Sequence, residues 1–231
     1  MPANRFFIAA PLNNTLILEG EEIHHFKVMR IRPGEAIEIV NGQGEIAVAE
    51  VTSLTNKQCE LKIVSHQKAP PPKQTVILAL ALTRPASLEW TFEKATELGA
   101  THFWLFPGKQ SEKKELPPSQ LRRLETIMIS ALKQCGRLYL PHITLKPALE
   151  QWPPPPGSLF FGDLSAKAPL KGPFEKTVTF FIGPEKGFSS TEIHILKEKF
   201  KAHPICLHEH ILRAETAAIT ILSQFSLLKM S

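Results

Sequence analysis

The sequence predicts an α/β protein with a mostly parallel sheet, preceded by a small β-barrel domain. Three observations lead to this fold class. Before residue 68, apolar residues alternate over short stretches, as in strands with one solvated face. A proline-rich run at 69–73 then interrupts the pattern. After residue 75, continuous apolar runs alternate with stretches of helical spacing, which is typical of a parallel sheet covered by helices. We therefore expect a β domain at 1–68, a linker at 69–74 and an α/β domain at 75–231.

The first domain has the pattern of a small barrel with one helix. Two alternating segments flank Asn41-Gly42-Gln43-Gly44, whose glycines suit a tight hairpin turn. A third alternating segment follows. Pro33 and Gly34 lie where the preceding helix has ended. The expected strands are 37–40, 46–51 and 59–64, and the expected helix is 21–29.

The second domain alternates buried strands with helices. Residues 76–82 form a continuous apolar run, as expected for a strand covered on both faces. Leu88, Phe92 and Ala95 then recur at helical spacing, and Gly99 follows where a glycine commonly ends a helix. The same reasoning gives strands at 76–82, 102–106, 142–145, 159–161, 177–182 and 205–207, and helices at 88–98, 121–135, 189–200 and 214–228.

Composition favours a globular, cytoplasmic protein. The chain is 43% hydrophobic and 21% charged, and no run approaches the roughly 20 apolar residues that span a bilayer. His24 and His25 have no partners at metal-ligand spacing, so no metal is expected. We expect the three isolated cysteines to be small buried apolar residues, namely Cys59, Cys135 and Cys206.

The positive charge lies in the second part of the chain. The net charge is +5, and residues 1–68 hold seven Lys or Arg against eight Asp or Glu, which leaves twenty against fourteen. This balance is compatible with a polyanionic partner but does not require one.

Two strand–loop–helix segments carry most of the chemical information. They are Phe181-Ile182-Gly183-Pro184-Glu185-Lys186-Gly187-Phe188-Ser189 and Leu207-His208-Glu209-His210-Ile211-Leu212-Arg213-Ala214-Glu215-Thr216-Ala217. Ligands of open α/β sheets bind outside the carboxyl ends of the strands, which makes both loops site candidates. Ser189 and Glu192 fit a capping box that starts a helix. The alternative is that the glycines and the proline only mark turns.

Motifs in a fixed order extend over nearly the whole chain. They are Arg5-Phe6-Phe7, His24-His25 with Val28-Met29-Arg30, Asn41-Gly42-Gln43-Gly44, the segment 94–99, Gln134 with Arg137, 182–185 with Gly187-Phe188, and 211–217. With these motifs the chain resembles the RsmE family of bacterial SPOUT-class methyltransferases. The segment 211–217 is the most specific of them.

The resemblance implies a fold, an activity, a cofactor and an oligomeric state. The expected fold is a PUA-like RNA-binding barrel followed by a SPOUT domain with a C-terminal trefoil knot. The expected activity is methylation of N3 of a uridine, at position 1498, in 16S ribosomal RNA of the small subunit, with S-adenosyl-L-methionine as the cofactor. The enzyme would be a homodimer that takes part in ribosomal RNA processing.

The resemblance also implies roles for individual residues. Arg213 would favour the anionic form of the uracil or bind a phosphate, and Glu185 is a weaker candidate for the base that takes the N3 proton. The expected cofactor-binding residues are Ile182, Gly183, Pro184, Glu185, Gly187, Leu207, His208, Ile211, Leu212, Arg213 and Thr216. The expected RNA-binding residues are Arg5, His25, Arg30, Arg32, Arg84, Lys94 and Arg137, with Arg122 and Arg123 as further candidates.

Some residues depart from the family pattern. Lys186 stands where a second glycine is usual, and His208 and His210 stand where a glycine and an arginine are usual. A left-handed backbone at His208 would be strained, and Lys186 places a cation near a cationic cofactor. The departures support an alternative, a ribosome- or RNA-binding SPOUT protein with weakened or lost methyl transfer. A SPOUT methyltransferase for another RNA site is a further alternative, whereas a nucleotide hydrolase lacks its P-loop lysine.

Overall fold

The computed structural model describes residues 4–230, apart from the side chains of Glu21, His25 and Met230. Its chain divides into two compact units. Unit 1 contains the described residues up to Pro72 together with Ile129–Leu140, and unit 2 contains Lys73–Met128 with the residues from Pro141 onward. The sequence assigned all of 75–231 to the second domain, so the membership of 129–140 in unit 1 is a difference from that prediction.

Unit 1 is built on a five-stranded sheet with the hydrogen-bonded order β1-β3-β4-β5-β2. Its inward-facing residues form one apolar core around Phe6, Phe26 and Ile39. One helix, α1 (Glu21–Val28), contributes Phe26, whose ring lies 4.1 Å from that of Phe6. The strands are β1 (Arg5–Phe7), β2 (Thr15–Glu19), β3 (Ala36–Val40), β4 (Glu45–Leu54) and β5 (Gln58–Lys68).

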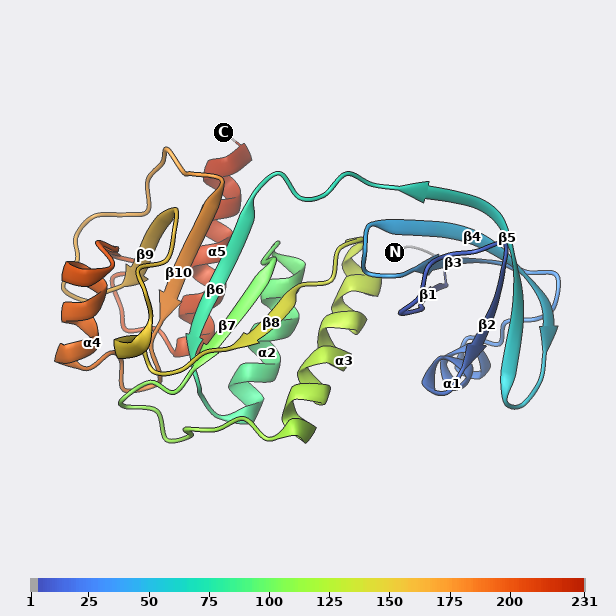
Figure 1. Cartoon of the computed structure of the whole chain (residues 1–231), viewed down its shortest axis with the longest axis horizontal. Helices are drawn as coiled ribbons and strands as arrows, with labels where there is room; N and C mark the ends of the chain where they lie inside the picture. Colours follow the sequence, from blue (N-terminus) through green and yellow to red (C-terminus); the bar gives the residue numbers. More distant parts are fainter. Residues whose placement is uncertain (1–3, 231) are drawn as a thin grey trace. The chain divides into compact units, whose positions relative to one another are not determined.

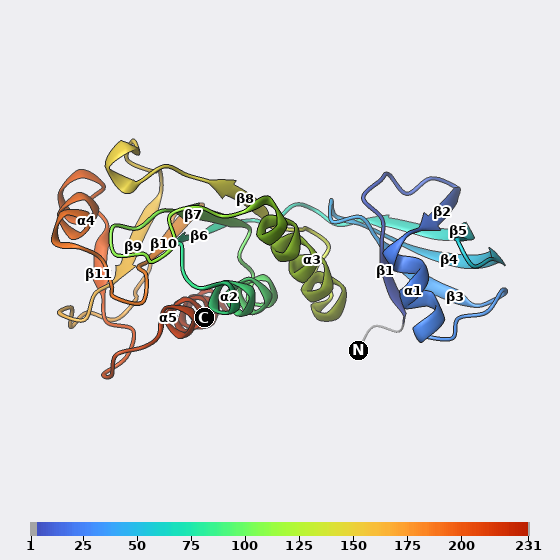
Figure 2. The same ribbon diagram turned by 90° about the horizontal axis from the view of Figure 1, so that it is seen from below.

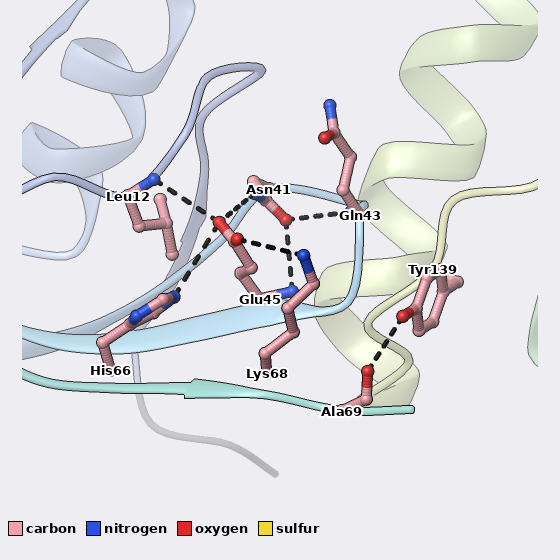
Figure 3. Close-up of polar contacts among 8 residues, drawn as sticks. All are labelled: Leu12, Asn41, Gln43, Glu45, His66, Lys68, Ala69 and Tyr139. Carbon is pink, nitrogen blue, oxygen red and sulfur yellow. Dashed lines mark hydrogen bonds and ion pairs between the residues drawn. The ribbon is translucent and has the colours of Figure 1, made fainter. Parts of the chain in front are cut away.

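Asn41 and Glu45 organise the hairpin turn between β3 and β4 (Figure 3). Asn41 Oδ1 accepts hydrogen bonds from the backbone N–H groups of Gln43 (2.9 Å) and Glu45 (3.2 Å), and Asn41 Nδ2 donates to Glu45 Oε2 at 2.6 Å. The Glu45 carboxylate also lies 3.7 Å from Lys68 Nζ and 3.8 Å from His66 Nε2. A side chain that bonds its own turn makes this loop stiff.

The segment after α3 (Pro118–Cys135) packs on this turn within unit 1. Gly44 N–H donates to the Leu138 carbonyl at 2.8 Å, and Tyr139 Oη donates to the Ala69 carbonyl at 2.8 Å. A Cβ at Gly44 would overlap with the phenol group of Tyr139, and the φ of Gly44 is +90°, so only glycine fits there. These contacts explain why 129–140 belongs to unit 1.

Unit 2 is built on a six-stranded parallel sheet with the order β11-β9-β10-β6-β7-β8 (Figures 1 and 2). The chain runs from β6 outward to β7 and β8, and then returns to place β9 and β11 beyond β10. The order therefore reverses next to β10, which is where such sheets bind ligands. The strands are β6 (Thr75–Ala81), β7 (His102–Phe106), β8 (His142–Leu145), β9 (Ser158–Gly162), β10 (Thr177–Ile182) and β11 (His203–Ile205).

Both faces of the strands β6, β9 and β10 are buried, as their continuous apolar runs predict. Successive strand residues point to opposite faces. On one face, Phe180 packs against Phe225 of α5 (Ala214–Met230), with ring centroids 5.3 Å apart. On the other, Phe181 packs against Phe200, with centroids 5.9 Å apart. The helix α2 (Pro85–Glu97) lies beside α5 (Figure 2).

Further expectations differ from the structure, and the strands β1 and β2 were not among the predicted ones. The last strand was expected at 205–207, but β11 is His203–Ile205. It ends at Ile205 because the Cys206 N–H donates to the Ala168 carbonyl, at 2.8 Å, and not to a neighbouring strand. The helix expected at 189–200 is a short α4 (Ser190–His194) continued by a π-helix, η2 (Ile195–Lys199). All three cysteines were expected to be buried, but only Cys59 is: Cys206 is half-buried and Cys135 is exposed at the end of α3.

The remaining short helix is η1 (Leu149–Gln151), a single 3₁₀ turn whose Leu149 is buried. Between residues 4 and 230, no helix has the length and apolar character needed to cross a membrane.

Candidate functional site

A pocket of about 310 Å³ lies at the carboxyl ends of β9, β10 and β11. These strands are neighbours in the sheet, so the loops that follow them converge. The loops are formed by 162–164, 182–188 and 207–217. The lining residues are Gly162, Asp163, Leu164, Ile182, Gly183, Pro184, Glu185, Lys186, Gly187, Phe188, Leu207, His208, His210, Ile211, Leu212, Ala214 and Ala217.

The loop after β10 is compact because two of its residues are glycines. A Cβ at Gly183 would lie 3.0 Å from the backbone nitrogen of Phe188, so a side chain there would push the loop apart. Gly187 has φ +76°, and its N–H donates to the Pro184 carbonyl at 2.8 Å. The loop therefore presents its backbone to the pocket in one defined shape.

A buried carboxylate anchors the far end of this loop. Ser189 and Glu192 form the capping box that the sequence predicts, with Glu192 N–H donating to Ser189 Oγ and Ser189 N–H donating to Glu192 Oε2 at 2.8 Å. Glu192 Oε1 accepts a further bond from Lys109 N–H at 2.9 Å. The residue is 1% exposed, so its bonds tie two loops together away from water.

The loop after β11 carries the two histidines that depart from the family pattern. Among residues 4–230, the non-glycine residues with positive φ are Asn4, Arg30 and Lys201, so the strain considered for His208 does not arise. His208 Nδ1 accepts a hydrogen bond from His210 N–H at 3.1 Å, which holds the turn. Gln224 of α5 supports the loop from below, since its Nε2 donates to the Leu207 carbonyl at 3.1 Å.

The sequence reading missed the third loop, Gly162-Asp163-Leu164. A Cβ at Gly162 would lie 3.1 Å from a Leu207 methyl carbon, so glycine lets β9 approach the β11 loop closely. Asp163 N–H donates to the Ile205 carbonyl at 3.0 Å. The rule that ligands bind outside the carboxyl ends of the strands could have identified this loop too. Like the loop after β10, it begins with a glycine at the end of an apolar strand, here followed by the polar Asp163.

Glu185, at the mouth of the pocket, belongs to a row of charged residues that contact one another. Its Oε1 accepts a hydrogen bond from Arg84 N–H at 3.2 Å, and Arg84 NH2 lies 3.3 Å from Glu112 Oε1. The hydrogen bond and the charge of Glu112, with the charge of Glu185, raise the pKa of Arg84. Arg84 in turn lowers the pKa of Glu112, to which Lys186 adds a smaller effect. The extra cation at Lys186 therefore faces a nearby anion.

Nine of the eleven proposed cofactor-binding residues line the pocket. The other two are Arg213 and Thr216, which are exposed at the start of α5, where Ala214 and Ala217 face the pocket instead. The Arg213 guanidinium has no partner among residues 4–230, and the Arg213 carbonyl accepts from Ala217 N–H at 2.8 Å. In the same part of the chain, no three His, Cys, Asp or Glu side chains gather to hold a metal ion.

The proposed RNA-binding residues are in different environments. Arg30 and Arg32 are exposed, whereas the Arg5 side chain is 9% exposed and bonds Glu38 Oε2 through Nε (2.9 Å) and NH2 (2.8 Å). Lys94 pairs with Glu93 (2.7 Å) and Glu97 (2.9 Å) on α2. Burial lowers the pKa of the half-buried Arg137, and the side chain of His25 lies outside the described ones.

Two family models match the chain in the order of its two units. The model of an RNA methyltransferase PUA domain matches residues 18–64, and that of an RNA methyltransferase domain matches residues 70–226. A ribosomal RNA small subunit methyltransferase E of Mesomycoplasma hyopneumoniae is 32% identical over 228 residues, which cover 95% of this chain and 97% of that protein.

Solved structures share the fold over nearly the full length. A Legionella pneumophila protein, solved with the cofactor SAM bound, superposes with a TM-score of 0.86, 25% identity and coverage of 98% of both chains. A ribosomal RNA small subunit methyltransferase E of Neisseria gonorrhoeae, solved with S-adenosyl methionine bound, gives a TM-score of 0.88, 24% identity and coverage of 97% of both chains. With 24% identity, the Neisseria gonorrhoeae structure is evidence for the fold and not for the function.

Proposed function

The chain belongs to the ribosomal RNA small subunit methyltransferase E (RsmE) family, and we propose that it transfers a methyl group from S-adenosylmethionine to N3 of a uridine, at position 1498, in 16S ribosomal RNA. The observation that carries this proposal is the pocket built by the loops after β9, β10 and β11. It lies on the elements that the RNA methyltransferase model matches, and its loops hold the motifs of the family.

The lining residues suit S-adenosylmethionine. A volume of about 310 Å³ lies at the lower end of the range for small-molecule sites, roughly 300 to 1,000 Å³. Ile182, Leu207 and Leu212 offer apolar walls for an adenine, and the Gly183 loop offers backbone amides and carbonyls beside them. The carboxylate of Glu185 offsets the charge of Lys186 in the pocket wall around a positively charged cofactor.

Arg213 and Glu185 are the proposed catalytic residues. S-adenosylmethionine, when bound, supplies a methyl group that its sulfonium already activates. Uridine N3 carries a proton, so the chain must provide a base for it or a cation that favours the anionic uracil. We assign the second role to Arg213, whose guanidinium is exposed beside the pocket, and the first to Glu185, which Arg84 N–H holds at the pocket mouth.

RNA binding is proposed to be mainly electrostatic. Arg30 and Arg32 are exposed in unit 1 and are the strongest candidates for phosphate contacts there. Arg137 is a half-buried candidate in unit 1, while Arg5, Arg84 and Lys94 would first have to leave their ion pairs with glutamates. The partner would be 16S ribosomal RNA or the small subunit, which places the protein in the cytoplasm.

The proposal includes a trefoil knot at the 182–188 and 207–217 loops and a homodimer. Exposed apolar side chains support the dimer. Ile211 is 80% exposed at the pocket, and Leu227 and Leu228 of α5 are 65% and 41% exposed. A second copy that covered them would remove this apolar surface from water.

The proposal is tested by cofactor titration followed by methyl transfer. We expect calorimetry to give micromolar affinity for S-adenosylmethionine, about −8 kcal/mol. Radioactive methyl groups should then enter 16S ribosomal RNA, and nuclease digestion should recover them as N3-methyluridine. Cofactor binding with labelling at another site would show that the substrate assignment is wrong.

The observation that favours the rival function is Lys186, a cation in the pocket wall. A protein that keeps the fold and RNA affinity but has lost methyl transfer would give no heat with millimolar S-adenosylmethionine. In that case Lys186→Gly combined with His208→Gly should restore cofactor binding.

A further inference from the structure

Asp163 is the only aspartate in the chain, and it is one of the residues that line the pocket. The side chain is 10% exposed. Asp163 directly follows the last residue of β9, and its backbone N–H donates to the carbonyl of Ile205, the last residue of β11. The backbone of Asp163 is therefore positioned by two neighbouring strands of the sheet, β9 and β11.

The Asp163 side chain is also held in one orientation. Oδ1 accepts from Ser165 N–H at 2.9 Å and from Ser165 Oγ at 2.7 Å, and Oδ2 lies 3.0 Å from Lys197 Nζ. Burial works against the charged form, but the bonds from Ser165 and Lys197 outweigh it and leave the pKa of Asp163 below its ordinary value. The group is thus an oriented carboxylate at neutral pH.

The hydrogen bonds leave room for a ligand at one oxygen. An ionised carboxylate has about four acceptor positions, two on each oxygen. Oδ1 takes two donors from Ser165, while Oδ2 takes one from Lys197. The free acceptor position is therefore on Oδ2, in a residue that faces the pocket.

The charge of Lys197 decides which kind of donor fits this position. Lys197 lies against the Phe161 ring, 5.7 Å from its centroid, and is held by η2. Because the Asp163–Lys197 pair is neutral as a whole, it attracts a further cation weakly. A neutral hydroxyl that donates to Oδ2 keeps the pair intact. The sulfonium and ammonium groups of the cofactor are cations, whereas its ribose carries two such hydroxyls.

We propose that Asp163 is a cofactor-binding residue that accepts a hydrogen bond from a ribose hydroxyl of S-adenosylmethionine. The inference rests on the proposed function. It assigns to the β9 loop the recognition of the sugar, next to the apolar walls that Ile182 and Leu207 provide for the base.

The test is a binding cycle with modified ligands and needs no methyl transfer. Calorimetry would compare S-adenosylhomocysteine with its 2′-deoxy and 3′-deoxy counterparts. We expect the unmodified protein to bind one of the deoxy ligands about ten to one hundred times more weakly than the parent, as for a lost hydrogen bond to a charged group. Asp163→Ala should bind the parent more weakly by a similar factor and no longer distinguish it from that deoxy ligand.

Two further variants serve as controls for the comparison of ligands. Glu209→Ala removes a charge from the neighbouring β11 loop, where Glu209 is 79% exposed and outside the pocket, and should distinguish the ligands as the unmodified protein does. Asp163→Asn keeps the side-chain volume and replaces Asp163→Ala if the alanine variant lacks a cooperative thermal transition. It should show reduced discrimination.

The outcomes separate the two proposals. Equal binding of all three ligands by the unmodified protein, or unchanged discrimination in the Asp163 variants, overturns the role of Asp163 and leaves the methyltransferase assignment standing. No binding of the parent ligand or of S-adenosylmethionine by the unmodified protein overturns the proposed function and this inference with it.

Discussion

Arg213 is exposed immediately before α5, so its side chain is available to a ligand and contributes little to folding. Its position differs from that of Arg5, whose guanidinium is engaged by Glu38. Residues of the same type thus separate into a candidate for catalysis and a structural ion pair, and burial is the property that distinguishes them.

Arg213→Ala should slow methyl transfer by at least a hundredfold, because the cation that favours the anionic uracil is removed. The free energy of unfolding should change by less than about 0.5 kcal/mol, as for other exposed substitutions. Single-turnover methylation of 16S ribosomal RNA and chemical denaturation measure the two quantities. Lys171→Ala, which removes an exposed cation outside the pocket, is the control. Near-normal turnover by Arg213→Ala would exclude Arg213 from the mechanism.

A second residue-level prediction concerns pH. Burial, and then the charge of His142, whose ring centroid is 5.3 Å away, lower the pKa of His102 below 6.5. As the pH falls below 6.5, the unfolded chain takes up a proton at His102 before the folded chain does, so stability is lost. The contribution of neutral His102 to the free energy of unfolding is fully present above pH 6.5. It decreases as the pH falls toward the pKa of His102 in the folded state.

Thermal unfolding between about pH 5 and pH 8 checks this dependence. His102→Gln should weaken the dependence of the melting temperature on pH in the acidic part of this range. His194→Gln, at an exposed position of α4, should leave it as it is in the unmodified protein. An identical pH dependence in His102→Gln and the unmodified protein would contradict the assignment.

The junction of the β10 loop, α4 and η2 shows how an element positions the pocket. The capping box starts α4 where the 183–188 loop ends, and η2 presents Lys197 to Asp163. A π-helix adds a residue to a helical turn, and such turns are frequent at functional sites. The same short helical segment thus holds the β10 loop at one end and the β9 loop at the other.

Glu192→Ala should lower the free energy of unfolding by about 3 kcal/mol, since it removes the buried carboxylate that accepts from the partly buried N–H groups of Ser189 and Lys109. It should also weaken cofactor binding by loosening the loop before Ser189. Glu198→Ala removes a 61% exposed glutamate from η2 and should have an effect below about 0.5 kcal/mol. Denaturant titration and calorimetry give the two quantities, and equal stability of both variants would show that the cap does not hold the loop.

The charge of the whole molecule bears on its RNA substrate. A net charge of +5 favours association with a polyanion, but individual cations differ in availability because glutamates neutralise several of them. The exposed arginines of unit 1, Arg30 and Arg32, are therefore expected to contribute more to RNA affinity than a count of basic residues suggests.

Arg32→Ala should weaken binding to a 16S ribosomal RNA fragment and lower the slope of log affinity against log salt by about one, as for one lost phosphate contact. Lys57→Ala, at an exposed position between β4 and β5, should leave the slope unchanged. Fluorescence anisotropy over a salt series measures it. Equal slopes for Arg32→Ala and the unmodified protein would remove Arg32 from the RNA-binding surface.

Strands made of continuous apolar runs could be predicted closely from the sequence. β7 and β10 have the expected bounds, His102–Phe106 and Thr177–Ile182, because a continuous apolar run between polar residues has few other solutions. β11 was misplaced because its end depends on Cys206 N–H finding the Ala168 carbonyl, a partner in another loop. The π-helix had no local signal, and Cys135 is exposed at the end of a stripe whose inner residues are buried.

The sequence by itself determined the alternation of strands and helices, two glycine loops at the site and the family motifs, because these depend on neighbours along the chain. Only the tertiary structure decided that Asp163 faces the same pocket and that 129–140 joins unit 1. The order of strands in a sheet sets which loops converge, and hydrogen bonds between distant segments set that order. Side-chain periodicity describes which face of an element is buried and carries no information about which element covers it.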